Sequence, residues 1–238
     1  MSNQIVTEKL SVTLKVYDPT TTANYRQYDE DFIHTKAYLH LASKLKFLCQ
    51  SFERPITILD VGCGTGRYFH VLTHVDRLIA LDYSENMLLQ AQHPFREAEI
   101  PMDKIVFHQG NFYDFDFGNQ SFDFIYSIGV LGEHTVFDEH VCNKLFKLLR
   151  PGGKLYFTVV DLQSRKSFKR KIMEALYPFT PIGIKRILDK RWETCYLTWT
   201  QLDNIVSKQG FEVYQIERYI SEDPKWKGVH LECIATKL

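Results

Sequence analysis

The sequence predicts an α/β fold in which helices cover both faces of a mostly parallel β-sheet. Short apolar runs rich in β-branched residues alternate with longer amphipathic segments, a pattern typical of β-α-β units. The first such run, residues 56–61, leads directly into a glycine-rich turn at residues 62–66. Near the C-terminus two runs, 211–219 and 229–236, follow each other with no helix between them, which favours an antiparallel pair.

Composition and charge bound the class of protein. The 238 residues are 45% hydrophobic, enough to fill the core of one domain with an insertion. Lys plus Arg and Asp plus Glu number 29 each, so no overall basic field attracts nucleic acid or an anionic surface. The five cysteines are scattered without a C-x-x-C pair, which argues against a disulfide framework and a zinc site. We find no signal sequence and no apolar run of roughly 18 residues, so we expect a cytoplasmic protein without stable membrane insertion.

The chain is expected to divide at about residue 54. Residues 1–54 form an N-terminal lid and helix segment, in which Asp18 to Thr22 breaks regular structure and residues 29–50 form a helix with one apolar face. Residues 55–238 form the domain that carries the glycine-rich turn, with an insertion at about residues 161–197.

The glycine-rich turn predicts a binding site for a small ligand. Residues 67–75 after it are predicted to form a helix, whose positive end and bare backbone N–H groups suit an anionic group. The spacing Gly62, Gly64, Gly66 differs from the dinucleotide pattern G-x-G-x-x-G, because Arg67 occupies the third glycine position. Asp82 ends the next apolar run, where its carboxylate could accept hydrogen bonds from ribose hydroxyls.

The remaining elements follow from their caps and apolar runs. Ser84 can cap a helix that runs to about Gln92, and Thr198 with Gln201 can form a capping box. The other predicted elements are strands at residues 105–108, 122–128 and 154–160, and helices at residues 136–149 and 198–208.

The chain from about Tyr17 onward resembles the class I S-adenosylmethionine-dependent methyltransferases. LDVGCGTG at residues 59–66 and LDYSENML at residues 81–88 look like their first two motifs. Asn111-Phe112, residues 122–131 and LRPGGKLYF at residues 149–157 look like the next three, in the family's order. The resemblance implies a Rossmann-like three-layer α/β sandwich with a seven-stranded, mostly parallel sheet and one antiparallel strand.

The resemblance also implies S-adenosylmethionine as cofactor, S-adenosylhomocysteine as product, and no metal. Its cofactor-binding residues would be contributed by the ends of the first four strands. The glycines would allow close backbone approach to the methionine end, Asp60 would anchor that end, Asp82 and Tyr83 would contact ribose or adenine, and Asn111 and Phe112 would bind adenine. The full expected set is Asp60, Gly62, Cys63, Gly64, Gly66, Asp82, Tyr83, Asn111, Phe112 and Ser127.

Catalysis would depend mainly on placement, so a general base is not strictly required. If the acceptor is a hydroxyl, Glu133 or His134 is the best candidate, because both directly follow the fourth strand and His titrates near neutrality. The alternative is a solvent-facing pair at the start of the next helix. The resemblance also makes four residues of the N-terminal segment candidates for a lid, namely Tyr17, Tyr25, Arg26 and Tyr28.

The acceptor is expected to be a small molecule methylated on oxygen or nitrogen. Nucleic acid is disfavoured, because Tyr126-Ser127-Ile128-Gly129 stands where enzymes acting on base amines carry prolines and an Asn or Asp. Between Arg165 and Arg191 the insertion holds nine Lys or Arg residues, which could be a solvated face, a cap for an anionic acceptor, or a contact with anionic lipid. Two other functions stay open, a non-catalytic cofactor-binding module that acts through a protein partner and an NAD-dependent oxidoreductase.

Overall fold

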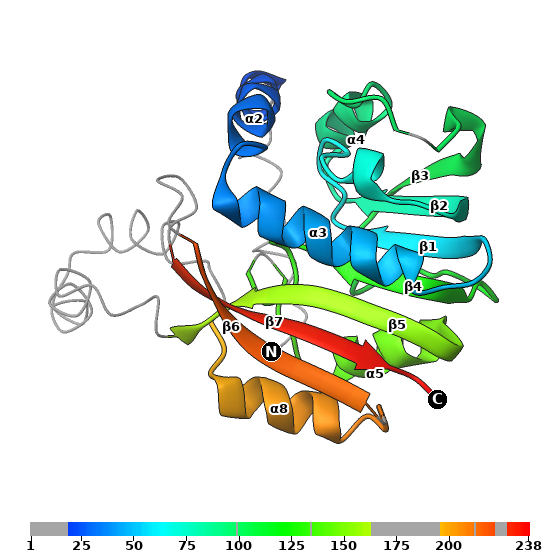
Figure 1. Cartoon of the computed structure of the whole chain (residues 1–238), viewed down its shortest axis with the longest axis vertical. Helices are drawn as coiled ribbons and strands as arrows, with labels where there is room; N and C mark the ends of the chain where they lie inside the picture. The colour runs from blue at the N-terminus through cyan, green and yellow to red at the C-terminus, as the bar shows by residue number, and fades with distance from the viewer. Residues whose placement is uncertain (1–18, 99, 134, 163–195, 212, 222–227) are drawn as a thin grey trace, which may run out of the picture.

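The computed structural model of the chain describes residues 19–98, 100–133, 135–162, 196–211, 213–221 and 228–238. Within these residues seven strands form a single sheet in the order β3-β2-β1-β4-β5-β7-β6 (Figure 1). The strands are β1 (Ile56–Val61), β2 (Val75–Asp82), β3 (Ile105–Gln109), β4 (Phe122–Ser127), β5 (Leu149–Val160), β6 (Val213–Ser221) and β7 (Gly228–Thr236).

One strand of the sheet is reversed. β1 pairs in parallel with β2 and β4, and β4 pairs in parallel with β5. β7 pairs antiparallel with both β5 and β6, so that Ile234 lies opposite Tyr156 on one side and Gln215 on the other. This arrangement confirms the predicted mostly parallel, seven-stranded sheet with one antiparallel strand. Because β1, β2 and β4 are parallel, their carboxyl ends meet at one edge of the sheet.

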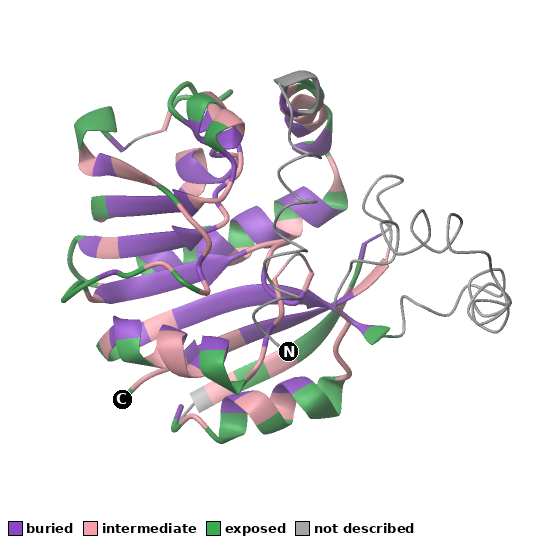
Figure 2. Cartoon of the chain, turned by 180° about the vertical axis from the view of Figure 1, so that it is seen from behind, coloured by how far each residue is buried: buried purple, intermediate pink, exposed green. Residues whose placement is uncertain are grey.

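Helices cover both faces of the sheet. One face packs against α2 (Pro19–Phe32), α3 (Lys36–Gln50) and α4 (Glu85–Ala91), and the other against α5 (Glu139–Leu148) and α8 (Trp199–Ser207). Successive strand residues alternate between the two apolar cores, with Ile58 in the first and Leu59 in the second. Figure 2 shows the buried residues concentrated in the strands and on the inner sides of the helices. The predicted three-layer α/β sandwich is therefore confirmed.

The N-terminal helices differ from the prediction. Residues 18–22 were expected to break regular structure, yet α2 begins at Pro19, a residue favoured in the first helical turn because it lacks an N–H. The predicted continuous helix at residues 29–50 is wrong, because α2 ends at Phe32 and α3 begins at Lys36. Thr35 caps α3, since its side chain accepts a hydrogen bond from the Tyr38 N–H and donates one to the Phe32 carbonyl.

The predicted helix at residues 67–75 is also wrong. Only a single 3₁₀ turn, η1 (Phe69–Val71), follows the glycine-rich turn. Leu72 is already extended, and His74 has a φ of +57° immediately before β2 begins. Side-chain packing accounts for the short turn, because the Tyr68 ring stacks on Tyr38 with ring centroids 5.5 Å apart and so binds this segment to α3. No long helix therefore faces the ligand site, and the N–H groups of Gly62, Cys63 and Gly66 bond backbone carbonyls of the protein itself.

The segment between β4 and β5 is close to the prediction. α5 is shorter than the predicted helix at residues 136–149, because Asp138 caps its start and accepts a hydrogen bond from the Val141 N–H. β5 begins at Leu149, directly after α5, and includes the Pro151-Gly152-Gly153 sequence. The predicted capping box is confirmed at Thr198, whose side chain accepts a hydrogen bond from the Gln201 N–H.

Three predicted features lie wholly or mainly outside the described residues. These features are Tyr17, His134 and the basic segment from Arg165 to Arg191. Of the predicted insertion, the structure describes only residues 161–162 and 196–197, where Asp161 and Leu197 form an isolated parallel bridge. The division of the chain at about residue 54 and the basic cap stay predictions.

Candidate active site

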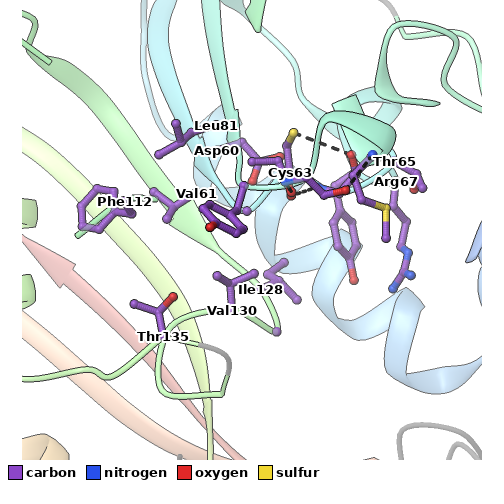
Figure 3. Close-up of a pocket in the computed structure, with 18 of the residues that line it drawn as sticks. Asp60, Val61, Cys63, Thr65, Arg67, Leu81, Phe112, Ile128, Val130 and Thr135 are labelled. Carbon is purple, nitrogen blue, oxygen red and sulfur yellow. Dashed lines mark hydrogen bonds between the residues drawn. The ribbon is translucent and has the colours of Figure 1, made fainter. Parts of the chain in front are cut away.

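A cavity of about 220 Å³ opens at the carboxyl ends of β1, β2 and β4. Side chains and backbone from the strand ends, the glycine-rich turn and α2 surround it (Figure 3). In Figure 3, Phe112 and Arg67 lie at opposite ends of the view, with Asp60 and Cys63 between them. The predicted site residues that line the cavity are Asp60, Gly62, Cys63, Gly64, Asp82, Tyr83, Asn111, Phe112 and Glu133.

The glycines of the turn have positive φ angles but different surroundings. A Cβ at Gly62 would lie 2.3 Å from the Val130 side chain, and a Cβ at Gly66 would lie 2.7 Å from the Phe69 ring. A Cβ at Gly64, which has a φ of +55°, would meet nothing within 4 Å. Because Gly64 lines the cavity, a side chain there would extend into space that a ligand can use. Gly62 and Gly66 allow close packing instead.

Asp82 shapes the turn and faces the cavity. Its two carboxylate oxygens accept hydrogen bonds from the Gly64 N–H at 2.8 Å and the Ser84 N–H at 2.9 Å. Burial raises the pKa of Asp82, and these backbone N–H groups oppose the rise. The Tyr83 N–H also stabilises the charged form. A carboxylate has about four lone-pair sites, so these three N–H groups leave one for a hydroxyl group of a ligand.

Asp60 is buried between two other polar groups. The Tyr126 hydroxyl donates a hydrogen bond of 2.5 Å to the Asp60 Oδ2 atom. Burial raises the pKa of Asp60 to about 8, the bond from Tyr126 opposes this, and the charge of Asp82 adds to it. Among the described residues no Lys or Arg pairs with Asp60. The site therefore holds a carboxyl group whose negative charge would be stabilised by a cationic ligand.

α2 forms one wall of the cavity and is tied to the turn. Asp29 accepts hydrogen bonds from the Thr65 hydroxyl and from the Arg67 Nε atom, the latter at 2.5 Å. The Arg67 guanidinium also lies 5.3 Å from the centre of the Tyr28 ring and 4.9 Å from that of Phe32. Arg67 is therefore fully engaged in holding the wall.

The predicted lid residues have different positions. Tyr25 and Tyr28 line the cavity. Arg26 points elsewhere, because its Nη1 atom donates hydrogen bonds to the Gln90 side chain at 3.1 Å and the His93 carbonyl at 2.8 Å. Arg26 thus joins α2 to the end of α4.

The turn after β3 lies at the other end of the cavity. The Asn111 carbonyl accepts hydrogen bonds from the Asp114 and Phe115 N–H groups, and its side-chain oxygen accepts one from the Tyr113 N–H at 3.1 Å. Phe112 is buried and lines the cavity. Among the described residues, no protein acceptor takes the Phe112 N–H. This N–H is available to a ring nitrogen of a ligand.

Glu133 lies in the loop that follows β4. An added Cβ at Gly129 would lie 3.7 Å from the Glu133 Oε2 atom, which places this carboxyl close to the end of the strand. Glu133 is partly exposed to the cavity, yet the protein atoms around it raise its pKa to about 7 by desolvation. A carboxyl with that pKa can accept a proton near neutrality.

Two predicted cofactor-binding residues do not line the cavity. Gly66 packs against Phe69, and Ser127 is fully buried with its hydroxyl donating to the Val61 carbonyl at 2.9 Å. Ser127 thus joins the end of β4 to the end of β1, and Gly66 packs against η1. Their contact with a cofactor stays a prediction.

Sequence reasoning missed three residues that hold the site. Tyr126 and Thr65 lie within motifs but were not assigned a role, and Asp29 lies outside every motif, although each makes a hydrogen bond that shapes the cavity. Tyr126 could have been found, because a tyrosine inside an apolar strand needs a partner for its hydroxyl. Asp29 and Thr65 carry no comparable signal, since they lie 36 positions apart in the sequence.

The cavity fits an adenosyl group with an amino-acid tail. Asp82 offers a carboxylate acceptor for a hydroxyl, Phe112 offers an N–H, and Asp60 offers a carboxyl for a cation. Within the described residues, no three His, Cys, Asp or Glu side chains gather as metal ligands would. In the same part of the chain, every helix is too short or too polar to cross a bilayer.

Comparisons with known proteins agree with this geometry. Residues 58–153 match the model of a methyltransferase domain family. Probable methyltransferase ltbC of Aspergillus luteorubrus is 30% identical over 144 residues, which span 56% of this chain and 50% of that protein. A sterol 24-C-methyltransferase of Debaryomyces hansenii is 32% identical over 98 residues, spanning 40% of this chain and 26% of that enzyme. The chain thus spans half or less of the length of these two curated relatives.

The fold also matches solved structures. Magnesium protoporphyrin IX methyltransferase (ChlM) from Synechocystis PCC 6803, with bound SAH, superposes with a TM-score of 0.64. The alignment covers 96% of this chain and 99% of that one at 13% sequence identity. At this level of identity the likeness concerns the fold alone.

Proposed function

We propose that this protein is a class I S-adenosylmethionine-dependent methyltransferase, because residues 58–153 match the model of a methyltransferase domain and the fold is that of this class. The acceptor that we propose is an oxygen or nitrogen atom of a small molecule. The observation that carries the proposal is the pairing of Asp82 with the turn. This carboxylate receives the Gly64 and Ser84 N–H groups and keeps an acceptor for a ribose hydroxyl, beside a glycine that is open to the cavity.

The residues at each end of the cavity suggest how the cofactor would lie. Asp82 would hold the ribose, Asn111 and Phe112 the adenine, and Asp60 the ammonium of the methionine end. Tyr83, Cys63 and Gly64 would contact the same ligand from the turn. Bound S-adenosylmethionine would supply an electrophilic methyl group on a sulfonium sulfur. Binding of this cation should lower the pKa of Asp60 again, since an opposite charge favours the carboxylate.

The protein's main contribution to the rate would be placement. Holding two reactants in line supplies about 7–11 kcal/mol, whereas a general base supplies roughly 10²–10⁴-fold. Glu133 is the candidate base, because its carboxyl lies at the end of β4 and has a pKa of about 7. It could take the proton from an O–H or N–H acceptor as the new bond forms. His134, the other predicted base, stays a prediction.

Calorimetry and methyl transfer test the proposal together. We expect the protein to bind S-adenosylhomocysteine and to show no comparable affinity for NADH. Radiolabelled methyl groups should then pass from S-adenosylmethionine to members of a panel of phenols, carboxylic acids and amines. Binding without transfer to any acceptor would favour a non-catalytic module. Binding of NADH alone would overturn the proposal.

A pair of glutamate variants tests the base. Glu133→Gln should lower kcat by roughly 10²–10⁴-fold for acceptors that lose a proton. It should leave the dissociation constant of S-adenosylhomocysteine within about twofold. Glu139→Gln is the matched control, since Glu139 is an exposed residue that pairs with Lys208 at 2.7 Å. Equal kcat for Glu133→Gln and the wild type would exclude Glu133 as the base.

A further inference from the structure

Lys144 of α5 reaches into the turn that follows β3. Its Nζ atom lies 2.7 Å from the Phe112 carbonyl oxygen, 3.2 Å from that of Tyr113 and 2.6 Å from that of Phe115. The ammonium also lies 5.1 Å from the centre of the Phe112 ring and 5.6 Å from that of Phe117. Lys144 thus contacts four residues of one short segment.

These contacts use the full donor capacity of the side chain. An ammonium has three N–H donors, and three carbonyls accept them. Burial lowers the pKa of Lys144, while the charges of Asp114 and Asp116 oppose that shift. Hydrogen bonds from a charged donor are about twice as strong as neutral ones. The turn lies between β3 and β4, outside any helix or strand. Its three carbonyls therefore have no hydrogen bonds of a helix or sheet, and Lys144 supplies the donors.

The turn is therefore fixed from two sides. Its own Asp114 and Phe115 N–H groups bond the Asn111 carbonyl, at 3.1 and 2.8 Å. Lys144 bonds the carbonyls that follow. These two sets of hydrogen bonds fix the backbone on either side of Phe112. The Phe112 N–H and the Asn111 side chain are the groups assigned above to adenine. Lys144 itself is absent from the lining of the cavity.

We propose that Lys144 is a positioning residue for the adenine end of the cofactor, acting through the turn and not by direct contact. The ammonium holds the turn in the shape that presents Asn111 and Phe112 to the cavity. This inference rests on the proposed function, because it assumes that adenine binds at this turn. It predicts that loss of the ammonium weakens cofactor binding without removing any cavity-lining group.

Lys237 provides a matched control within the same molecule. Its Nζ atom donates to the carbonyls of Phe146 and Leu149, at 2.8 and 2.7 Å, and lies 4.5 Å from the centre of the Phe146 ring. Both lysines therefore bond backbone carbonyls and an aromatic ring, and burial lowers the pKa of both. Lys237 anchors the end of α5 and lies far along the chain from the adenine turn.

The test compares Lys144→Met with Lys237→Met. We expect Lys144→Met to weaken S-adenosylhomocysteine binding by tenfold or more, measured by calorimetry. It should also reduce the preference for S-adenosylhomocysteine over the analogue in which hypoxanthine replaces adenine. In the ligand-free protein, amide hydrogen exchange at residues 111–115 should become at least tenfold faster. Lys237→Met should change none of these quantities more than twofold.

Each other outcome is informative. Unchanged affinity and exchange in Lys144→Met would overturn the inference, as would equal losses in both variants. If Lys144→Met does not fold, Lys144→Gln, which keeps two N–H donors, should show intermediate affinity and exchange, and wild-type values would overturn the inference. Failure of the wild type to bind S-adenosylhomocysteine would overturn the proposed function. Exchange at residues 111–115 would still report whether Lys144 holds the turn.

Discussion

Two buried aspartates lie at opposite ends of neighbouring strands and differ in their hydrogen-bond partners and in the direction of their pKa shifts. Asp123, at the start of β4, accepts hydrogen bonds from the Thr57 N–H at 2.8 Å, from Arg54 at 2.7 Å and from Arg150 at 2.8 Å. Burial alone would raise its pKa, but these partners outweigh burial and lower it. Asp60, at the end of β1, accepts a hydrogen bond from the neutral Tyr126 hydroxyl, and its pKa rises to about 8.

The contrast separates a structural carboxylate from one kept for a ligand. At the amino end of the sheet, the chain supplies the cations that neutralise Asp123. At the carboxyl end, the described part of the chain supplies no cation to Asp60, which lies beside a second carboxyl at Asp82 and a cavity. Perturbed carboxyls in a cleft are typical of functional sites, because a ligand completes the charge balance. The two ends should therefore respond differently to mutation and to pH.

The largest effect is expected at Asp123. Asp123→Ala should lower the free energy of unfolding by ~3 kcal/mol, because it removes hydrogen bonds to two guanidinium groups and leaves a buried N–H unpaired. Urea denaturation would measure the loss. Calorimetry under native conditions should give an unchanged dissociation constant for S-adenosylhomocysteine. A loss of binding free energy larger than the loss in free energy of unfolding would contradict a purely structural role for Asp123.

Asp82→Ala, in contrast to Asp123→Ala, should weaken cofactor binding. We expect cofactor affinity to fall by ~2–3 kcal/mol, since the variant removes a charged acceptor from the cavity and loosens the turn that it holds. Calorimetry with S-adenosylhomocysteine measures this change. Asp76→Ala is the control on the same strand, because Asp76 is exposed and lies 3.9 Å from Lys104. Unaltered affinity in Asp82→Ala would remove Asp82 from the site.

The pH dependence of stability should distinguish Asp60 from its counterpart. The folded pKa of Asp60, about 8, exceeds the ordinary value of 3.8, so the folded protein binds more protons between these values. Stability from this group is present at low pH and is lost as the pH rises through 8. Between pH 6 and 9 the wild type should lose about 2 kcal/mol more than Asp60→Asn, measured by chemical denaturation. Parallel pH profiles for the two proteins would show that Asp60 does not titrate in this range.

The smallest effect compares two glycines of one turn. Gly64→Ala and Gly66→Ala both place a side chain at positive φ, which costs about 1 kcal/mol. The Gly66 variant should lose further stability, because its Cβ would lie 2.7 Å from the buried Phe69 ring. The Gly64 variant should lose about 1 kcal/mol of cofactor affinity instead, since its methyl group enters the cavity. Thermal unfolding and calorimetry of both variants would reveal whether the two effects separate.

Much of the sheet could be predicted from sequence. β1, β2 and β4 are apolar runs with clear ends, and the short sequence separation of the last two apolar runs predicted the reversed strand. Most of the predicted cofactor residues line one cavity, because parallel strands bring their carboxyl ends together. The cofactor residues at the strand ends could therefore be predicted from short sequence motifs alone.

The features of the fold and site that the sequence did not predict depend on contacts between distant segments. Residues 67–75 were predicted to form a helix, yet stacking of Tyr68 on Tyr38 and the early start of β2 reduce it to a 3₁₀ turn. The raised pKa of Glu133 arises from the protein atoms packed around it, which no motif encodes. Lys144 likewise looks like an ordinary helix lysine until the turn after β3 is placed beside it.

The attachment of α2 has a consequence for how the chain is assembled. α2 is synthesised early, but the groups that hold it, Thr65, Arg67, Gln90 and His93, follow 36 to 67 residues later. We expect α2 to remain undocked on a nascent chain until β1, η1, β2 and α4 have emerged and folded. α2 would then join the cavity only after β1 and β2, the strands that carry Asp60 and Asp82, are in place.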